Sequence, residues 1–261
     1  MIPILNEKKY VEDIINSSTL PEKMSVNMMI TYLTKYYYIN SNSIAEVIEK
    51  VCTQMDKFNI DIRYYQEYKC KSRVEKICKS IADEKIELLK EHTGIPLYKS
   101  EYDRIMMCEN DKEKKLLFTI YILARYTDRY GWVYNPRNEI FKLANISSTT
   151  KGYKEIIFNL LHNGYIKNTN KVDDIKIGVD LADTSEDVIL EINNINNLGN
   201  QFIAFIKDDY KLCESCGKLI KIKNLKAHST KYCTKCADEI RQEKRAEYNQ
   251  KYYEKSKENK N

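Results

Sequence analysis

The first third of the chain carries apolar residues at the spacing of amphipathic helices. Apolar side chains recur three and four residues apart in three segments, Ser25–Tyr38, Ser43–Phe58 and Ser72–Leu89. This spacing brings them to one face of a helix, and Ser25 stands where an N-cap residue is expected. Gly94 and Pro96 then break the pattern. We therefore expect an all-helical unit over residues 1–98.

The next unit, residues 99–206, begins with two helical patterns. A wide apolar face predicts a helix over Lys112–Tyr130, which Gly131 would end. Asn135 followed by Pro136 is typical of an N-cap and first helical position. We expect a short second helix to follow them and to reach Ala144.

A turn rich in Ser and Thr, residues 145–150, separates this short helix from a third helix over 150–163. Gly164 occupies the place of a helix-terminating glycine. Residues 165–181 then predict two short strands around an Asn/Asp-rich turn. The order of helix, short helix, turn, helix and hairpin predicts a winged-helix-like unit.

The remaining elements complete a mainly α fold with small β elements. Residues 187–192 predict a strand, whereas the short apolar run 198–206 fits either a helix or a strand. Residues 207–238 are predicted to form a zinc ribbon. Residues 239–261 are predicted to form a polar helical tail stabilised by Glu, Lys and Arg pairs.

Charge is distributed unevenly along the chain. Residues 1–206 contain 28 basic and 29 acidic residues, whereas residues 207–261 contain 15 and 9. A basic C-terminal quarter on a neutral body favours a polyanionic partner, although a merely solvated surface has the same composition. No apolar run is long enough to span a membrane, and the N-terminus lacks the pattern of a signal peptide. We therefore expect a cytoplasmic protein with reduced thiols and no membrane partner.

Four cysteines form two CxxC pairs near the C-terminus: Cys213, Cys216, Cys233 and Cys236. A two-residue spacer lets both sulfur atoms of a pair reach one metal ion, and two such pairs complete a tetrahedral zinc shell. A closed shell has no open position for water, so the zinc would be structural. Two disulfides conflict with a reducing compartment. An iron–sulfur cluster and ligation by His228 are the remaining alternatives.

Polar residues at the start of the third helix and in the hairpin, together with the lysines between the cysteine pairs, are candidate nucleic-acid contacts. Hydroxyls, helix-start amides and lysines all suit phosphate oxygens. The candidates are Ser148, Thr149, Thr150, Lys151, Lys154, Lys176, Lys218, Lys221 and Lys223. Alternating lysine and apolar residues over 218–223 predict a strand with one lysine-bearing face. The alternative is that all of these side chains are simply solvated.

The chain resembles uncharacterised proteins of phages and mobile elements in low-GC Gram-positive bacteria. The resemblance rests on Cys213-Glu-Ser-Cys216-Gly217, on Tyr232-Cys233-Thr-Lys-Cys236 and on the helix after them, with EIFKLANIS and NLLHNGYIK in the middle of the chain. It implies an all-α N-terminal part, a winged-helix-like middle and a C-terminal zinc ribbon. It also implies a DNA-associated accessory or regulatory role.

The sequence therefore supports two functional hypotheses. The first is a zinc-containing DNA- or RNA-binding accessory protein of a phage or mobile element. The second is a protein-binding factor that inhibits or adapts a host or defence complex on the same scaffold. We find no catalytic constellation and no signature of a small-molecule substrate, so enzymatic activity is not expected.

Overall fold

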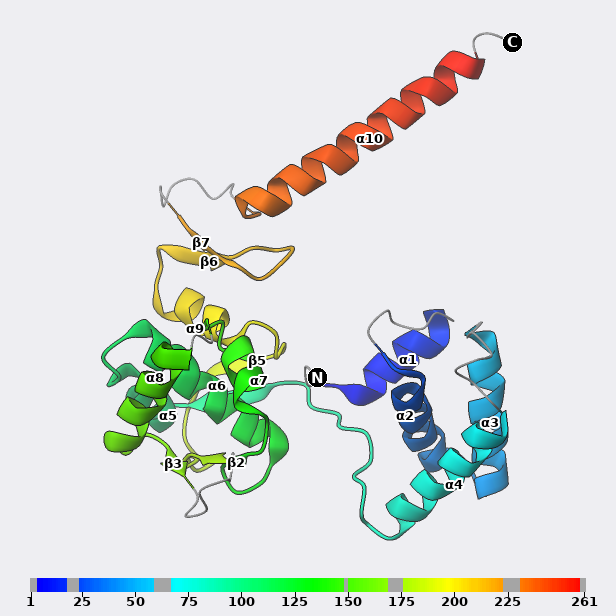
Figure 1. Cartoon of the computed structure of the whole chain (residues 1–261), viewed down its shortest axis with the longest axis horizontal. Helices are drawn as coiled ribbons and strands as arrows, with labels where there is room; N and C mark the ends of the chain where they lie inside the picture. The colour runs from blue at the N-terminus through cyan, green and yellow to red at the C-terminus, as the bar shows by residue number, and fades with distance from the viewer. Residues whose placement is uncertain are drawn as a thin grey trace. The chain divides into compact units, whose positions relative to one another are not determined.

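The computed structural model describes residues 4–17, 24–58, 67–147, 150–168, 176–222 and 231–258. The chain divides into two compact units, Pro3–Gly94 and Ile95–Asn261 (Figure 1). Both are mainly helical, and the described strands form small antiparallel sheets within the second unit. The predicted fold class, mainly α with small β elements and a cysteine cluster before the last helix, is thus confirmed.

Four helices form the first unit: α1 (Glu7–Ser17), α2 (Val26–Ile39), α3 (Ile44–Lys57) and α4 (Glu67–Ala82). The hydroxyl of Ser25 accepts a hydrogen bond from the backbone N–H of Met28, and Ser43 caps α3 in the same way through Glu46. These bonds satisfy amides that have no partner inside the helix. The predicted N-cap and both helix starts are therefore confirmed.

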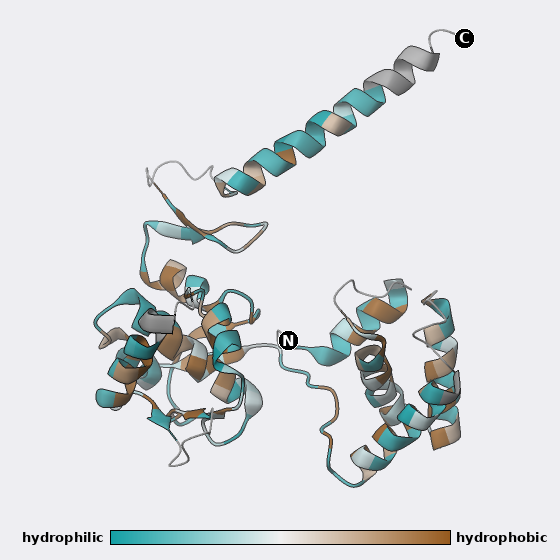
Figure 2. Cartoon of the chain, in the orientation of Figure 1, coloured by the Kyte–Doolittle hydropathy of each residue, from teal (hydrophilic) through white to brown (hydrophobic). Residues whose placement is uncertain are grey.

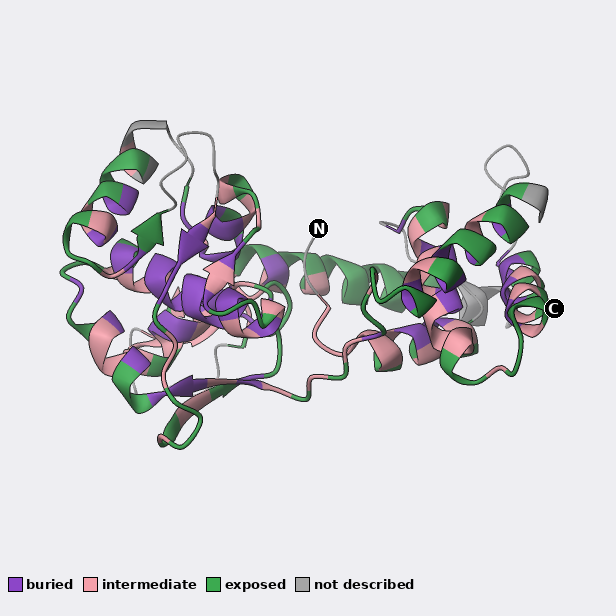
Figure 3. Ribbon diagram, turned by 90° about the horizontal axis from the view of Figure 1, so that it is seen from below, coloured by how far each residue is buried: buried purple, intermediate pink, exposed green. Residues whose placement is uncertain are grey.

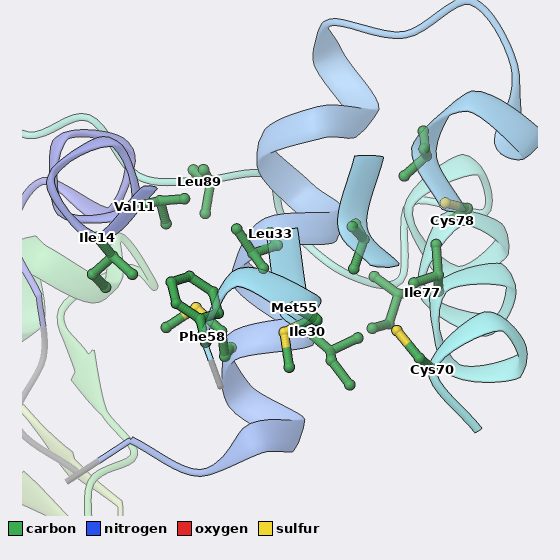
Figure 4. Packing of buried hydrophobic residues seen from close by; sticks show 14 of the residues in the cluster. Val11, Ile14, Ile30, Leu33, Met55, Phe58, Cys70, Ile77, Cys78 and Leu89 are labelled. Atoms are coloured by element: carbon green, nitrogen blue, oxygen red, sulfur yellow. The ribbon is translucent and has the colours of Figure 1, made fainter. Parts of the chain in front are cut away.

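The core of this unit is built from the apolar faces that the helical spacing predicted. Val11, Leu33, Val51 and Val74, one from each helix, are completely buried. Figure 4 shows neighbouring members of the cluster meeting between the helices. Residues of similar size from four different helices exclude water from one volume, which is what stabilises a small helical domain.

The fourth helix ends earlier than its apolar period predicted. It stops at Ala82 rather than Leu89, because Glu84 adopts a left-handed conformation and the N–H of Lys85 returns to the carbonyl of Ser80. The chain beyond the turn is not helical, yet Leu89 still joins the core. Burial here continues along an extended segment, so the apolar pattern outlasts the helix.

The second unit begins at Ile95, not after residue 98. Residues Ile95–Tyr98 form β1, which pairs antiparallel with β5 (Val188–Ile192), with Ile95 opposite Ile192. The chain between these strands therefore starts and ends at one small sheet. Gly94 and Pro96, which break the helical pattern, mark this boundary in the sequence, whereas pairing with a strand far along the chain leaves no local signal.

Helix α6 (Asp111–Thr127) forms the centre of the second unit. All nine residues from Leu116 to Ala124 are buried, and a helix that is buried on every side needs neighbours all round it. It contacts α5 (Lys99–Met106), α7 (Arg137–Leu143), α8 (Thr150–His162) and α9 (Leu198–Ile206). Buried residues accordingly occupy the middle of this unit (Figure 3).

A three-stranded antiparallel sheet accompanies α7 and α8. Its strands are β2 (Trp132–Val133), β3 (Lys167–Asn168) and β4 (Ile177–Gly178), in the order β2–β4–β3. The predicted hairpin strands β3 and β4 do pair, and β2 adds to them from before α7. Helix α7 begins at Arg137 with Pro136 as its N-cap, one position later than predicted. Gly164 follows α8 with a positive φ of 69°, as a terminating glycine does.

The last elements are α9, a β-hairpin and a long helix. The apolar run 198–206 is helical, which settles the one element that the sequence left open. Strands β6 (Tyr210–Leu212) and β7 (Leu219–Lys221) pair antiparallel, and α10 (Thr234–Glu258) begins within the second CxxC pair. Helix α10 is hydrophilic along almost its whole length (Figure 2). None of the helices in the described ranges combines the length and apolar composition that crossing a membrane requires.

Candidate metal centre

The first cysteine pair lies in the turn between β6 and β7. The strands align Leu212 with Leu219, and the turn closes when the N–H of Cys213 donates to the carbonyl of Lys218 over 2.8 Å. The N–H of Gly217 donates back to the carbonyl of Cys213 over 2.9 Å. Gly217 has a φ of +67°, a left-handed conformation that glycine adopts without strain. We call Cys213–Gly217 the first knuckle.

The second cysteine pair leads into α10. Cys236 lies in the first turn of this helix, and the N–H of Ala237 donates to the carbonyl of Cys233. Two bonds join this segment to the first knuckle: the N–H of Cys233 donates to Sγ of Cys213 over 3.3 Å, and that of Glu214 donates to the carbonyl of Lys231. The two pairs therefore face each other.

The four sulfur atoms lie together in the geometry of one metal site. All are within 4.8 Å of one another, and Sγ of Cys216 and Sγ of Cys233 are 3.8 Å apart. Four sulfurs at about 2.3 Å from one ion in a tetrahedron are about 3.8 Å from each other. A disulfide would bring a pair to about 2 Å. The predicted quartet is thus brought together, with room for a single ion.

Hydrogen bonding and close packing shift the pKa values of two cluster thiols in opposite directions. Burial raises the pKa of Cys213, but backbone N–H groups of Cys233, Cys216 and Ser215 outweigh it and lower this pKa to about 6. A hydrogen bond with Ser215 lowers the pKa of Cys236, yet its three cysteine neighbours raise it to about 12. Several thiolates this close repel one another, and a divalent cation removes that penalty.

The other four cysteines lie outside this cluster. Cys70, Cys78 and Cys108 are buried, and Cys52 is half-buried. Burial raises the pKa of Cys108 to about 12 and raises that of Cys78 as well. A buried thiol with a high pKa is a poor ligand and nucleophile. These residues pack as small hydrophobic side chains.

The candidate contacts at the start of α8 are described only in part. Ser148 and Thr149 lie outside the described residues, and Thr150 and Lys151 are described by their helical backbone alone. Lys154 is exposed. On the same helix Phe158 is 65% exposed, and its ring stacks on that of His162 with centroids 5.7 Å apart. The described surface of α8 therefore offers a cation and a large apolar ring.

Lys176 belongs to a cluster that the sequence did not indicate. Its Nζ lies 4.9 Å from the centroid of the Tyr134 ring, and the guanidinium of Arg129 lies 4.9 Å from the same centroid. Arg129 and Tyr134 flank β2, and Lys176 directly precedes its partner strand β4. Sequence spacing gave no signal for this grouping, because only the β2–β4 pairing brings these residues together.

Only one of the candidate lysines of the ribbon lies in a described strand. Lys218 and Lys221 are both exposed, but β7 begins at Leu219, so Lys218 belongs to the turn before it. Lys221 lies 3.8 Å from the carboxylate of Asp209, and Lys223 is outside the described residues. The prediction of a single lysine-bearing strand face therefore stays a prediction.

Comparison with known proteins adds no assignment. No family model, no curated protein and no solved structure matches the chain. Its function therefore has to follow from its own geometry.

Proposed function

We propose that this protein is a zinc-containing, nucleic-acid-binding accessory or regulatory protein. The observation that carries the proposal is the order α6, β2, α7, α8, β3, β4 with a sheet ordered β2–β4–β3. This order resembles that of a winged helix-turn-helix, and the resemblance supports the proposal. In that motif the second helix of the pair, here α8, enters the major groove while the hairpin forms the wing.

The charges that suit this role are modest in number but lie on the expected elements. Lys154 is exposed on α8, and Arg129 and Lys176 both lie over the Tyr134 ring, beside the paired strands β2 and β4. Lysine and arginine at these places contact phosphate oxygens and fix the orientation of a duplex. Asn159, the one amide side chain described on α8, donates to Glu113 on α6 over 3.0 Å instead of pointing to a base. We infer affinity for the backbone rather than strong sequence selectivity.

The metal in the cysteine cluster is proposed to be zinc. Four cysteine sulfurs within 4.8 Å of one another match the ligand set that structural zinc prefers. With four sulfur ligands no position remains for water, so the ion holds β6, β7 and the start of α10 together and takes no part in chemistry. The phage or mobile-element origin and the cytoplasmic location rest on the resemblance of the CxxC segments and on the reduced thiols that zinc requires.

A binding titration tests the nucleic-acid proposal. We expect a labelled duplex to bind with an affinity that falls steeply with salt, because each phosphate contact releases counterions. Lys151→Ala combined with Lys154→Ala should weaken binding by about tenfold and flatten the salt dependence by about two contacts. The matched control is Lys76→Ala with Lys79→Ala, two exposed lysines with the same spacing on α4. Fluorescence anisotropy measures both variants.

The control variant loses the same charge from the other unit. If nucleic acid binds α8, the control keeps wild-type affinity. Equal losses in both variants would mean that only net charge matters. No binding of either duplex or single strand at low salt would remove the proposal.

A second candidate function is favoured by Phe158. An aromatic ring that is 65% exposed on the outer face of α8 is the kind of residue that anchors protein–protein interfaces. In this case the protein would be a protein-binding factor, such as an inhibitor or adaptor of a host or defence complex. Phe158→Ser should abolish capture of the partner from a nuclease-treated lysate, whereas the Lys151/Lys154 variant should retain it. Capture that disappears after nuclease treatment favours nucleic acid instead.

A further inference from the structure

Three asparagines connect the turn before α8 to the first knuckle. Asn145 follows α7 in that turn, Asn197 precedes α9, and Asn200 lies in the first turn of α9. None of them belongs to the cysteine motif or to the candidate nucleic-acid contacts. Their side chains nevertheless form hydrogen bonds that connect the turn to the first knuckle.

On one side the asparagines hold the turn. Nδ2 of Asn145 donates to Oδ1 of Asn197 over 2.8 Å. The backbone N–H of Asn200 donates to Oδ1 of Asn145 over 3.1 Å. Both polar atoms of the Asn145 side chain are thus used by α9 and the residue before it. The position of the turn is therefore set by α9.

On the other side the same residues hold the knuckle. Nδ2 of Asn197 donates to the carbonyl of Cys216 over 3.3 Å, and Nδ2 of Asn200 donates to the carbonyl of Gly217 over 3.2 Å. These carbonyls belong to the turn that bears two of the four metal ligands. Whatever fixes that turn fixes the acceptors of both asparagines.

Two glycines show how closely the parts approach. A Cβ atom at Gly217 would lie 2.3 Å from Nδ2 of Asn197, and one at Gly199 would lie 1.9 Å from the carbonyl oxygen of Ala144. Both distances are far inside van der Waals contact. The knuckle therefore touches Asn197, and α9 touches the end of α7, directly and without intervening side chains.

The network has little freedom to relax. Asn200 is only 8% exposed, and its Oδ1 accepts from Nζ of Lys115 on α6 over 3.1 Å. Asn145 and Asn197 both adopt left-handed backbone conformations, with φ of 54° and 55°. Asparagine tolerates this region better than most residues. Asn145 and Asn197 are half-buried, and a hydrogen-bonded network of this kind favours one arrangement of the groups that it joins.

We propose that Asn145, Asn197 and Asn200 are positioning residues that couple metal binding to the helix-turn-helix. The metal joins the first knuckle to the second cysteine pair and fixes the two carbonyls of the knuckle. The asparagines transmit that position to the turn and hence to the start of α8. Without metal the sulfur–metal bonds that hold the knuckle in place are lost, and the turn loses its fixed support.

The consequence for nucleic acid rests on the proposed function. If α8 binds a duplex, the metal-bound protein binds more tightly than the metal-free protein. Coupling between two sites is reciprocal, so a duplex must also strengthen metal retention by the same factor. In this scheme the duplex does not contact the cysteine cluster, and the metal does not contact α8.

Hydrogen exchange tests the coupling without any nucleic acid. Peptides covering residues 137–163 are followed by mass spectrometry in the full chain, loaded with zinc or stripped by a chelator under reducing conditions. We expect exchange in this segment to become about tenfold faster on stripping, the scale of losing one or two supporting hydrogen bonds. Peptides covering 210–222 report directly on the knuckle.

Glycine variants separate the coupling from general stability. Asn145→Gly and Asn197→Gly remove the side chains and keep the left-handed backbone free of strain. In both, stripping should still speed exchange in 210–222 but should no longer change it in 137–163. Asn196→Gly is the matched control, because Asn196 is exposed beside Asn197 and its side chain takes no part in the network. This control should retain the wild-type response.

The inference is overturned if stripping leaves exchange in 137–163 of the wild type unchanged. It is equally overturned if that response persists in Asn145→Gly, because coupling would then run through other contacts. These results do not depend on whether any nucleic acid binds. A failed binding titration would remove the proposed function and leave the coupling intact.

Discussion

At the scale of single residues, the cysteines of the cluster differ in how deeply they are buried. Cys213 and Cys236 are buried, whereas Cys216 is exposed. The buried pair therefore holds the interior of the site, and a change there affects both the ligand set and the packing around it. A serine hydroxyl stays protonated at neutral pH and is a hard donor, so it replaces a thiolate poorly.

Cys236→Ser is accordingly expected to lose its metal. Wild-type protein should carry about one ion per chain after gel filtration, as a closed four-sulfur shell requires, and the variant close to none. Elemental analysis by mass spectrometry measures this directly. Cys52→Ser removes a thiol from the first unit and is the control, with full occupancy expected. A variant that retains stoichiometric metal would contradict the assignment of Cys236 as a ligand.

Glu101 is a buried acidic residue of the second unit. Its side chain is 1% exposed and pairs with Arg125 through Oε1 to Nη2 at 2.6 Å. The same carboxylate accepts from the backbone N–H groups of Ala182 and Tyr98, and Arg125 also lies over the Tyr98 ring. One acid thus joins α5, α6, β1 and the chain before β5.

Glu101→Ala should destabilise the second unit by about 3–5 kcal/mol, because it leaves the guanidinium of Arg125 buried without its partner. Urea unfolding followed by fluorescence of Trp132, the single tryptophan of the chain, reports on this unit specifically. Glu155→Ala, at an exposed position on α8, should change stability by less than about 0.5 kcal/mol. If Glu101→Ala changed the free energy of unfolding as little as Glu155→Ala, the Glu101–Arg125 ion pair would contribute nothing to stability.

At the scale of elements, α9 explains why a short apolar run became a helix. Leu198, Phe202 and Ile203 are buried against α6, and the Phe202 ring stacks on Phe118 with centroids 4.6 Å apart. These contacts follow a helical spacing that nine residues alone could not establish. Tertiary packing therefore decided the conformation of this segment.

Gly199→Ala tests how tightly α9 is seated. Alanine favours a helix over glycine by about 1 kcal/mol, but the added Cβ would meet the Ala144 carbonyl at 1.9 Å. We expect the steric clash to outweigh the gain in helix propensity and to destabilise the variant by about 2 kcal/mol. Trp132 fluorescence in urea measures this change.

Gly164→Ala provides the comparison. Its Cβ would enter open space, so its cost is the left-handed backbone alone, about 1 kcal/mol. If Gly199→Ala proved as stable as wild type, α9 would have to sit further from α7 than the structure has it.

At the scale of the whole molecule, the two units have separate cores and only one contains the cysteine cluster. Cys78 is buried in the first unit and Cys108 in the second. Because burial raises the pKa of both thiols, each reacts with an alkylating reagent chiefly after its own unit has opened. The chain thus carries one internal reporter of unfolding in each unit.

Metal removal is expected to act on one reporter only. A chelator should move the urea midpoint for alkylation of Cys108 to lower concentration, because the metal binds only the folded second unit. The midpoint for Cys78 should stay where it is. Quantifying both alkylated peptides by mass spectrometry in the same samples makes the comparison internal. Equal shifts of both midpoints would contradict independent units.

The sequence by itself determined what depends on local period and spacing. Helices α2, α3, α6, α7 and α8 followed from apolar residues three and four apart and from their capping residues. The metal quartet followed from two CxxC spacers, since a tight turn brings both sulfurs of a pair to one point. These features involve residues close in the chain, so short-range geometry is enough.

Only the tertiary structure decided what joins distant segments. The β1–β5 pairing places residues 95–98 in the second unit, and packing against α6 makes α9 helical. The asparagine network links residues more than fifty positions apart, such as Asn145 and Asn197, through side chains that no local pattern distinguishes from solvated ones. Long-range hydrogen bonds and burial depend on which distant segments come into contact in the folded chain. Local periodicity carries no information about those contacts.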